Sequence, residues 1–176
     1  VTYPRETISN PLALNLYTLS YDDNKRLVPL NEALKQNLRT YLSNFRMLTD
    51  ALNIKSAHII NIGIDFEIIP RQRYNSNEVL LRCIDLLKRL FEIDSMQINM
   101  PLNISNLMTE LDKVEGVQSV SKFEIINLYD LTKGYVGNLY DIETATKNNI
   151  VYPSLDPSIF EIRFPNADIK GKITSN

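Results

Sequence analysis

The sequence predicts an α+β fold, a two-layer sandwich in which a mixed or antiparallel sheet of about four strands is covered on one face by two main helices. Apolar and polar residues alternate from Ala57 to Ile69, as in a strand with one covered face. Apolar residues recur with helical spacing over residues 31–48 and 75–91. Residues 128–153 have no clean period, so we also expect an irregular C-terminal arm.

The chain begins with a polar segment, residues 1–11, whose two prolines indicate a linker or arm. Residues 12–20 are rich in strand formers. Asp22–Asn24 then predicts a turn, and residues 26–28 predict a return strand. The α+β core domain is therefore expected to span residues 12–127.

The first helix is predicted to run from Asn31, its N-cap, to about Leu48. Its apolar residues recur at i, i+4, i+7, i+8, i+11 and i+14, which places them on one stripe of the helix. They are Leu34, Leu38, Tyr41, Leu42, Phe45 and Leu48. We expect this stripe to help cover the sheet.

The clearest strand, Ala57–Ile69, has one apolar and one polar face. The apolar positions are Ile60, Ile62, Ile64, Phe66 and Ile68, and the polar ones are Asn61, Gly63, Asp65 and Glu67. This pattern predicts that the polar face lies toward solvent.

A second helix is predicted from Asn75, which has capping-box spacing to Glu78, to about Phe91. Its apolar side consists of Val79, Leu80, Cys83, Leu86, Leu87, Leu90 and Phe91. A shorter helix is expected over Ser105–Lys113, followed by a strand over Val117–Asn127.

The last third of the chain, residues 128–176, is rich in tyrosine and proline. Its tyrosines are Tyr129, Tyr135, Tyr140 and Tyr152, and prolines flank a predicted strand over residues 159–164. Tyrosine combines a large contact area with a polar tip, so these rings suit an interface, but they could equally cap the chain's own sheet. A polar tail with a short strand at residues 172–174 completes the arm.

Composition limits the class of protein. Of the 176 residues, 44% are hydrophobic and 23% charged, which is typical of a globular domain. The net charge is −2 and no block of like charge indicates a nucleic-acid groove or a membrane-binding face. The single cysteine, Cys83, cannot form an internal disulfide. The chain starts with Val1. A fragment of a larger protein and a chain processed at its N-terminus would fit this start about equally well.

No residue pattern predicts catalysis, a metal or a cofactor. His58 lies on the opposite strand parity from Asp65 and Glu67, and Cys83 falls on an apolar helix stripe. A pair of arginines beside Tyr74 is too small a cluster for nucleic-acid binding. We therefore expect ordinary structural roles for these residues, and no enzyme.

Four stretches together resemble one family: residues 38–50, 59–67, 112–120 and 152–161, of which Tyr-Pro-Ser-Leu-Asp-Pro from Tyr152 is the most specific. They are similar to the C-terminal part of the large baseplate wedge subunit of contractile-tailed phages of the T-even-like group, a family related to baseplate J proteins. The resemblance covers most of the chain and implies a structural protein of a virion tail baseplate, assembled in the host bacterial cytoplasm.

The resemblance also implies partners: a second copy of the chain, other baseplate wedge proteins and hub proteins, with contacts that join wedges into an inner ring. The expected interface residues are Tyr135, Tyr140, Tyr152, Pro153, Leu155, Phe160 and Phe164. The alternative is a stand-alone small-molecule-binding or regulatory α+β domain, which a deep apolar pocket with a few convergent polar groups would favour.

Overall fold

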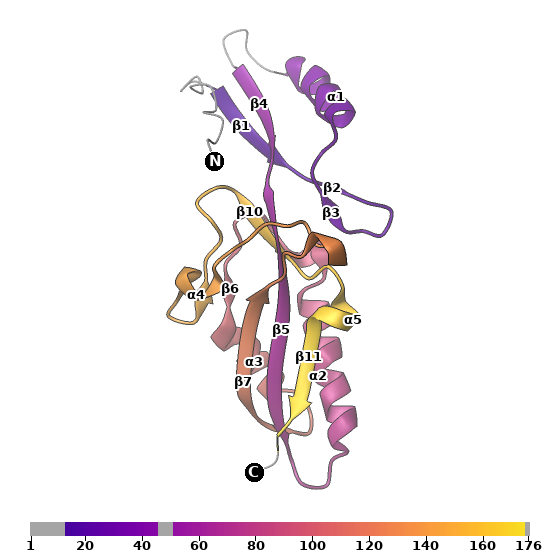
Figure 1. Cartoon of the computed structure of the whole chain (residues 1–176), viewed down its shortest axis with the longest axis vertical. Helices are drawn as coiled ribbons and strands as arrows, with labels where there is room; N and C mark the ends of the chain where they lie inside the picture. The colour runs from indigo at the N-terminus through magenta and orange to yellow at the C-terminus, as the bar shows by residue number, and fades with distance from the viewer. Residues whose placement is uncertain (1–12, 46–50, 175–176) are drawn as a thin grey trace. The chain divides into compact units, whose positions relative to one another are not determined.

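The longest strand, β5 (His58–Pro70), pairs with three other strands. β10 (Ser158–Glu161) runs parallel to its first residues, from His58 to Asn61. β11 (Ile169–Ile173) runs parallel to residues 64–68 of β5, and β7 (Val117–Asn127) runs antiparallel to residues 62–70. The result is a four-stranded mixed sheet, which confirms the predicted α+β class (Figure 1).

The structure is a computed structural model that describes residues 13–45 and 51–174. These residues form two compact units, one ending at Ala57 and the other beginning at His58. This boundary differs from the expected core domain of residues 12–127, because β10 and β11 place the C-terminal arm in the same unit as β5. The proposed linker, residues 1–11, lies outside the described residues.

Two helices pack against the four-stranded sheet. α2 (Ser76–Leu90) packs on β11 and β5, and α3 (Ile104–Asp112) packs on β7. Their inward residues are buried: Val79, Cys83, Leu87 and Leu111. Each helix has an asparagine N-cap whose side chain accepts a backbone N–H. Asn75 accepts the Asn77 N–H (3.1 Å), and Asn103 accepts the Asn106 N–H (3.0 Å). The predictions for residues 75–91 and 105–113 are thus confirmed as helices.

The first helix lies outside the unit that contains this sheet. α1 (Glu32–Ser43) lies in the N-terminal unit, and none of its residues is buried. Its predicted N-cap is confirmed, since Asn31 Oδ1 accepts the Leu34 N–H at 2.8 Å. The predicted extension to Leu48 enters residues 46–50, outside the described range. α1 thus belongs to a different unit from the sheet that its stripe was expected to cover, and the helices of the sheet's own unit that pack on it are α2 and α3.

The N-terminal unit contains two short sheets. β1 (Ala13–Thr18) pairs in parallel with β4 (Ala51–Ser56), a strand that the sequence pattern did not predict. β2 (Ser20–Tyr21) and β3 (Leu27–Val28) form the predicted hairpin. Its turn is closed by Asp22, whose Oδ1 accepts the N–H groups of Asn24 and Arg26, both at 2.8 Å.

The prediction of a solvent-facing polar side on β5 holds for only half of the strand. Residues 59–64 are all buried, including Asn61 at 1% exposure, whereas Asp65 and Glu67 are half-buried. The second face of residues 59–64 is covered by the arm, whose backbone and side chains bond to Asn61 and Ile59. The arm therefore completes the core around the first half of β5.

The arm is more regular than its sequence predicts. Between β7 and β10 lie a one-turn helix at residues 131–133 (η2, Leu131–Lys133), α4 (Ile142–Ala145), β8 (Thr146–Lys147) and β9 (Ile150–Val151). β9 also pairs with β6 (Leu102–Asn103). A one-turn helix, η1 (Ile93–Ser95), precedes β6 in the chain. After β10, α5 (Pro165–Asp168) leads into β11, which is longer than the strand expected at residues 172–174.

We predict that Gly171→Ala destabilises the sheet. A Cβ on Gly171 would lie 2.5 Å from Leu80 Cδ1 and 2.6 Å from Phe66 Cζ, between α2 and β5. Overpacking of this kind costs about 1–3 kcal/mol in the free energy of unfolding. Urea unfolding would measure the loss, with Gln118→Ala on an exposed position of β7 as the control. An unchanged midpoint for Gly171→Ala would contradict the close packing of α2 on β11.

Candidate functional site

The loop from Tyr152 to Pro157 presents an apolar side chain on an ordered frame. Ser154 N donates to Ser158 Oγ (3.1 Å), Asp156 N donates to Ser154 Oγ (3.1 Å), and that hydroxyl donates to Asp156 O (2.8 Å). Leu155 sits between them and is fully exposed, with a relative exposure of 108%. Hydrogen bonds and flanking prolines thus fix the backbone of a leucine whose side chain is left uncovered by the described part of the chain.

The base of this loop is fixed to two other segments. Asn99 N donates to Ser158 O (2.7 Å), and Ser158 N donates back to Asn99 Oδ1 (3.0 Å). His58 N donates to Pro157 O (2.8 Å) at the start of the β5–β10 pairing. We call residues 152–157 the Leu155 loop.

A buried polar cluster around Asn61 attaches the arm to β5. Asn61 Nδ2 donates to Glu161 Oε2 (2.6 Å), and Asn61 Oδ1 accepts the Val136 N–H (2.8 Å). Arg163 pairs with the same Glu161 oxygen at 3.2 Å, and these two side chains are 11% and 3% exposed. A buried carboxylate needs such partners to offset its desolvation, so this cluster fixes the path of the arm.

Two more asparagines extend the attachment of the arm. Asn138 Nδ2 donates to Ile59 O (2.8 Å). Asn127 Nδ2 donates to Asn61 O (3.0 Å), while its Oδ1 accepts the Tyr140 N–H (2.8 Å). These amide groups satisfy backbone atoms that the irregular segment would otherwise leave unpaired.

Tyr135 and Phe164 belong to the contacts of the arm with itself. The Tyr135 hydroxyl donates to Asp168 Oδ1 (2.6 Å), and the Tyr135 and Phe164 rings meet edge to face at 5.5 Å. Burial and the adjacent Asp168 carboxylate raise the pKa of Tyr135 to about 12. Asp168 also accepts the Phe164 N–H (2.8 Å), so Tyr135 and Phe164 share one carboxylate.

Tyr140 and Phe160, which lie next to the Leu155 loop, and Pro153 within it are all less exposed than Leu155. Tyr140 donates its hydroxyl hydrogen bond to Tyr152 O, and its ring packs edge to face on Phe160 at 6.0 Å. Phe160 is 1% exposed and belongs to the core of its own chain. Pro153 is half-buried, whereas Tyr152 is 46% exposed. Of the seven predicted interface residues, Leu155 and Tyr152 are thus the most accessible.

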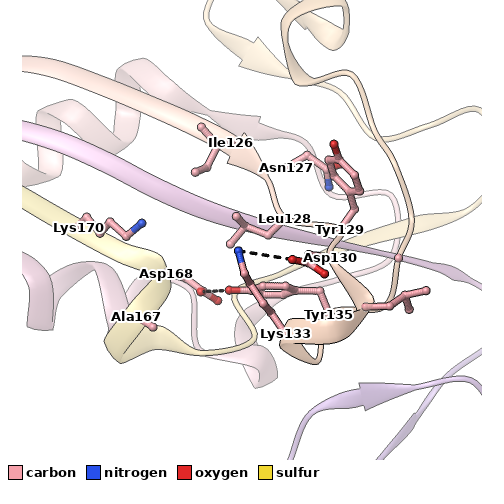
Figure 2. A pocket seen from close by; sticks show the side chains of 12 residues that line it. Ile126, Asn127, Leu128, Tyr129, Asp130, Lys133, Tyr135, Ala167, Asp168 and Lys170 are labelled. Carbon is pink, nitrogen blue, oxygen red and sulfur yellow. Dashed lines mark hydrogen bonds and ion pairs between the residues drawn. The ribbon is translucent and has the colours of Figure 1, made fainter.

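A cavity of about 910 Å³ lies where β7 leads into the arm (Figure 2). Ile126, Leu128 and Leu131 supply apolar walls, and Lys170 enters from β11. On the other side, hydrogen bonds from the Thr132 side chain and backbone hold the pKa of Asp130 below its usual value. Asp130 remains a carboxylate and pairs with Lys133 at 3.4 Å.

The structure does not bring the candidate catalytic side chains together. Cys83 is 0% exposed on α2, and burial raises the pKa of its thiol to about 11. Asp65 and Glu67 lie on the sheet face opposite α2, and His58 is exposed at the first residue of β5. A thiol that stays protonated and is separated by the sheet from both carboxylates has no base to activate it.

Asp65 and Glu67 have charged neighbours on the adjacent strands. Lys170 and Lys172 of β11 stand opposite them in register, and Lys122 of β7 stands opposite Glu67. Alternating charges on neighbouring strands stabilise an open sheet face. Asp65 and Glu67 thus belong to a row of alternating charges across β11, β5 and β7.

Among residues 13–45 and 51–174, no group of three or more His, Cys, Asp or Glu side chains is placed to hold a metal ion. In the same described part of the chain, no helix has the length and apolarity needed to cross a bilayer.

Sequence reasoning missed the asparagine anchors and placed Asn61 toward solvent. The available signal was an amide side chain amid isoleucines, in a stretch that is apolar on both sides of it. A polar residue within such a run indicates either a solvent face or a buried hydrogen-bonding partner, and only the distant Glu161 decides between them.

No model of a known protein family matches this chain, and no curated protein matches it with significance.

We predict that Asn61→Ala loosens the arm from β5. The substitution leaves the Val136 N–H without its acceptor and removes a donor from Glu161, which costs about 1–3 kcal/mol in the free energy of unfolding. Hydrogen exchange should accelerate at Val136 and neighbouring amides. The matched control is Asn53→Ala, which removes only an exposed amide bond to Asn15. Equal effects of the two substitutions would contradict the anchoring role of Asn61.

Proposed function

We propose that this chain is a structural module of a contractile-tail baseplate wedge, which joins a second copy of itself and neighbouring wedge and hub proteins. The Leu155 loop is the observation that carries the proposal. It belongs to the stretch that most resembles the baseplate wedge family, and it holds an apolar side chain rigidly in solvent. Ordered apolar groups of this kind act as anchors that fill a pocket on a partner.

The hydrogen bonds of the loop favour binding without reorganisation. Ser154, Ser158 and Asn99 fix the backbone before any partner arrives, so little conformational entropy is lost when Leu155 is buried. Tyr152 stands three residues away with 46% of its surface exposed and widens the contact. A stable ring contact built around these residues would bury on the order of 1,200 Å² or more in total.

The test uses the genome that encodes this chain. Deletion of its gene should abolish complete tails in electron micrographs, and the wild-type gene supplied from a plasmid should restore them. Leu155→Asp should restore fewer complete tails, because loss of an anchor costs about 2 kcal/mol or more at an interface. The control is Leu81→Asp, which changes a 60% exposed leucine on α2.

The outcomes test the baseplate function and the role of the Leu155 loop separately. Complete tails after deletion of the gene would refute the baseplate function. Full restoration by Leu155→Asp would refute the role assigned to the Leu155 loop, and equal loss with Leu81→Asp would show that the effect is not specific to that loop.

The cavity favours a second candidate, a small-molecule-binding domain. Its apolar walls and the lysine at its edge suit an amphiphilic carboxylate, whose apolar body would lie on Leu128 and whose charge would reach Lys170.

A thermal-shift titration with aliphatic and aromatic carboxylates tests this second candidate. Lys170→Ala should weaken binding about tenfold, because a hydrogen bond to a charged group contributes about 1.5–3 kcal/mol. Lys172→Ala, also on β11 but outside this cavity, is the control. The absence of any carboxylate-dependent shift would exclude this class of ligand.

A further inference from the structure

The Leu155 loop carries an apolar group and a charged group side by side. Leu155 is fully exposed, and the next residue, Asp156, is exposed as well. Tyr152 adds a ring with 46% of its surface exposed. The backbone between them is held by the Ser154 and Ser158 hydroxyls, through hydrogen bonds of 2.8–3.1 Å. The loop therefore presents a leucine and a carboxylate together on one ordered backbone.

The cavity beside η2 and α5 has the complementary chemistry. Leu128 and Leu131 are among its apolar walls, and Lys170 lies on the side away from the pair of Lys133 and Asp130 (Figure 2). Leu131 is 71% exposed, so the cavity opens at the surface. Lys133 is already held by Asp130 at 3.4 Å, whereas Lys170 forms no ion pair within the described part of the chain. A group that fills this cavity should thus combine an apolar body with a negative charge.

We propose that the Leu155 loop of one copy of this chain inserts into the cavity of a second copy, with Leu155 on the apolar walls and the Asp156 carboxylate beside Lys170. The inference rests on the proposed function, because it names the surface that the Leu155 anchor fills. Charge complementarity selects this occupant, since the loop brings a carboxylate to an ammonium group that its own chain leaves unpaired. The cavity volume of about 910 Å³ is that of a site for a drug-sized ligand, so it accommodates more than one side chain of the loop.

The loop and the cavity lie on different sides of the C-terminal unit. In Figure 1 the loop that leads into β10 lies to the left of β5, and α5, which borders the cavity through Ala167 and Asp168, lies to its right. The base of the loop is fixed by the hydrogen bonds between Asn99 and Ser158, at 2.7 and 3.0 Å. A loop fixed in this way does not reach the cavity of its own chain, so the loop that fills the cavity comes from another copy.

A contact between two different surfaces does not stop at two copies. The copy that donates its loop keeps an open cavity, and the copy that receives the loop keeps a free loop of its own. Such a heterologous contact repeats head to tail and gives a closed ring or an open chain of copies, depending on the rotation between neighbours. The closed form is the arrangement expected of baseplate wedges in an inner ring. A short loop buries less surface than a standard interface, so we expect a dissociation constant of about 10–500 μM.

Sedimentation of the full chain at about 10–500 μM tests the contact. The mean mass of the wild type should rise with concentration and pass that of a dimer. Leu155→Asp should weaken association about tenfold or more because it removes the apolar anchor, and Lys170→Glu should do the same because it sets a carboxylate against Asp156. The matched controls are Leu81→Asp, on α2, and Lys172→Glu, on β11 but outside this cavity, which should associate as the wild type does.

A mixture of the two weakened variants then tests the head-to-tail arrangement. Leu155→Asp retains an intact cavity and Lys170→Glu retains an intact loop, so the mixture should form a 1:1 complex that grows no further. A charge exchange gives an independent check. Asp156→Lys and Lys170→Glu in one chain should restore the self-association that either single substitution weakens. Far-ultraviolet circular dichroism of each variant would verify that the fold is retained.

Failure of this contact and failure of the baseplate function give different results. A wild type that stays monomeric across the range overturns the contact, whereas deletion of the gene tests the baseplate function separately. Association that stops at the dimer overturns the head-to-tail arrangement. Association that Leu155→Asp weakens, but that Lys170→Glu and the charge exchange leave unchanged, overturns the cavity as the receiving surface. Equal losses with Leu81→Asp or Lys172→Glu would overturn the assignment to these two surfaces.

Discussion

The fold of the C-terminal unit depends on the burial of the first half of β5 on both faces. Residues 59–64 are apolar except for Asn61 and Gly63, and a strand so placed needs covering layers on each side. α2 supplies one layer through its packing on β5 and β11, and the arm supplies the other. The hydrogen bonds of Asn61 to Glu161 and Val136 make the second layer specific, because another path of the arm would leave the buried Asn61 amide without these two partners.

Much of the fold follows from local sequence. The periods of α2, α3, β5 and β7 predict those elements, and Asn31 and Asn75 predict the N-caps that are observed. What local pattern cannot predict is which surfaces meet. The apolar stripe of α1 is as regular as that of α2, yet α1 belongs to a different unit from the four-stranded sheet, since partner choice depends on the path of the chain rather than on the period. The position of Asn61 likewise depends on Glu161, one hundred residues later.

The candidate contact surface was only partly predictable, because local sequence does not show which side chains meet the rest of the chain. Proline and tyrosine in residues 152–165 indicate a contact surface, but composition does not separate rings that face inward from groups that face outward. The hydrogen bonds of Ser154 and Ser158 turn Leu155 outward, while β10 pairing turns Phe160 inward, although the two residues are five positions apart. The Leu155 loop thus offers an apolar group on a backbone that local hydrogen bonds have already ordered.

The long separation between β5 and its parallel partners also affects how the chain is made. β10 and β11 begin 100 and 105 residues after the β5 residues that they join. At about 5–20 residues per second of synthesis, the isoleucine-rich strand waits roughly 5–20 s for them on the ribosome. During that interval its apolar residues and one hydrogen-bonding edge are open, which is the condition under which strands aggregate. Pairing with β7, which lies nearer in sequence, can form first and shield the other edge of β5.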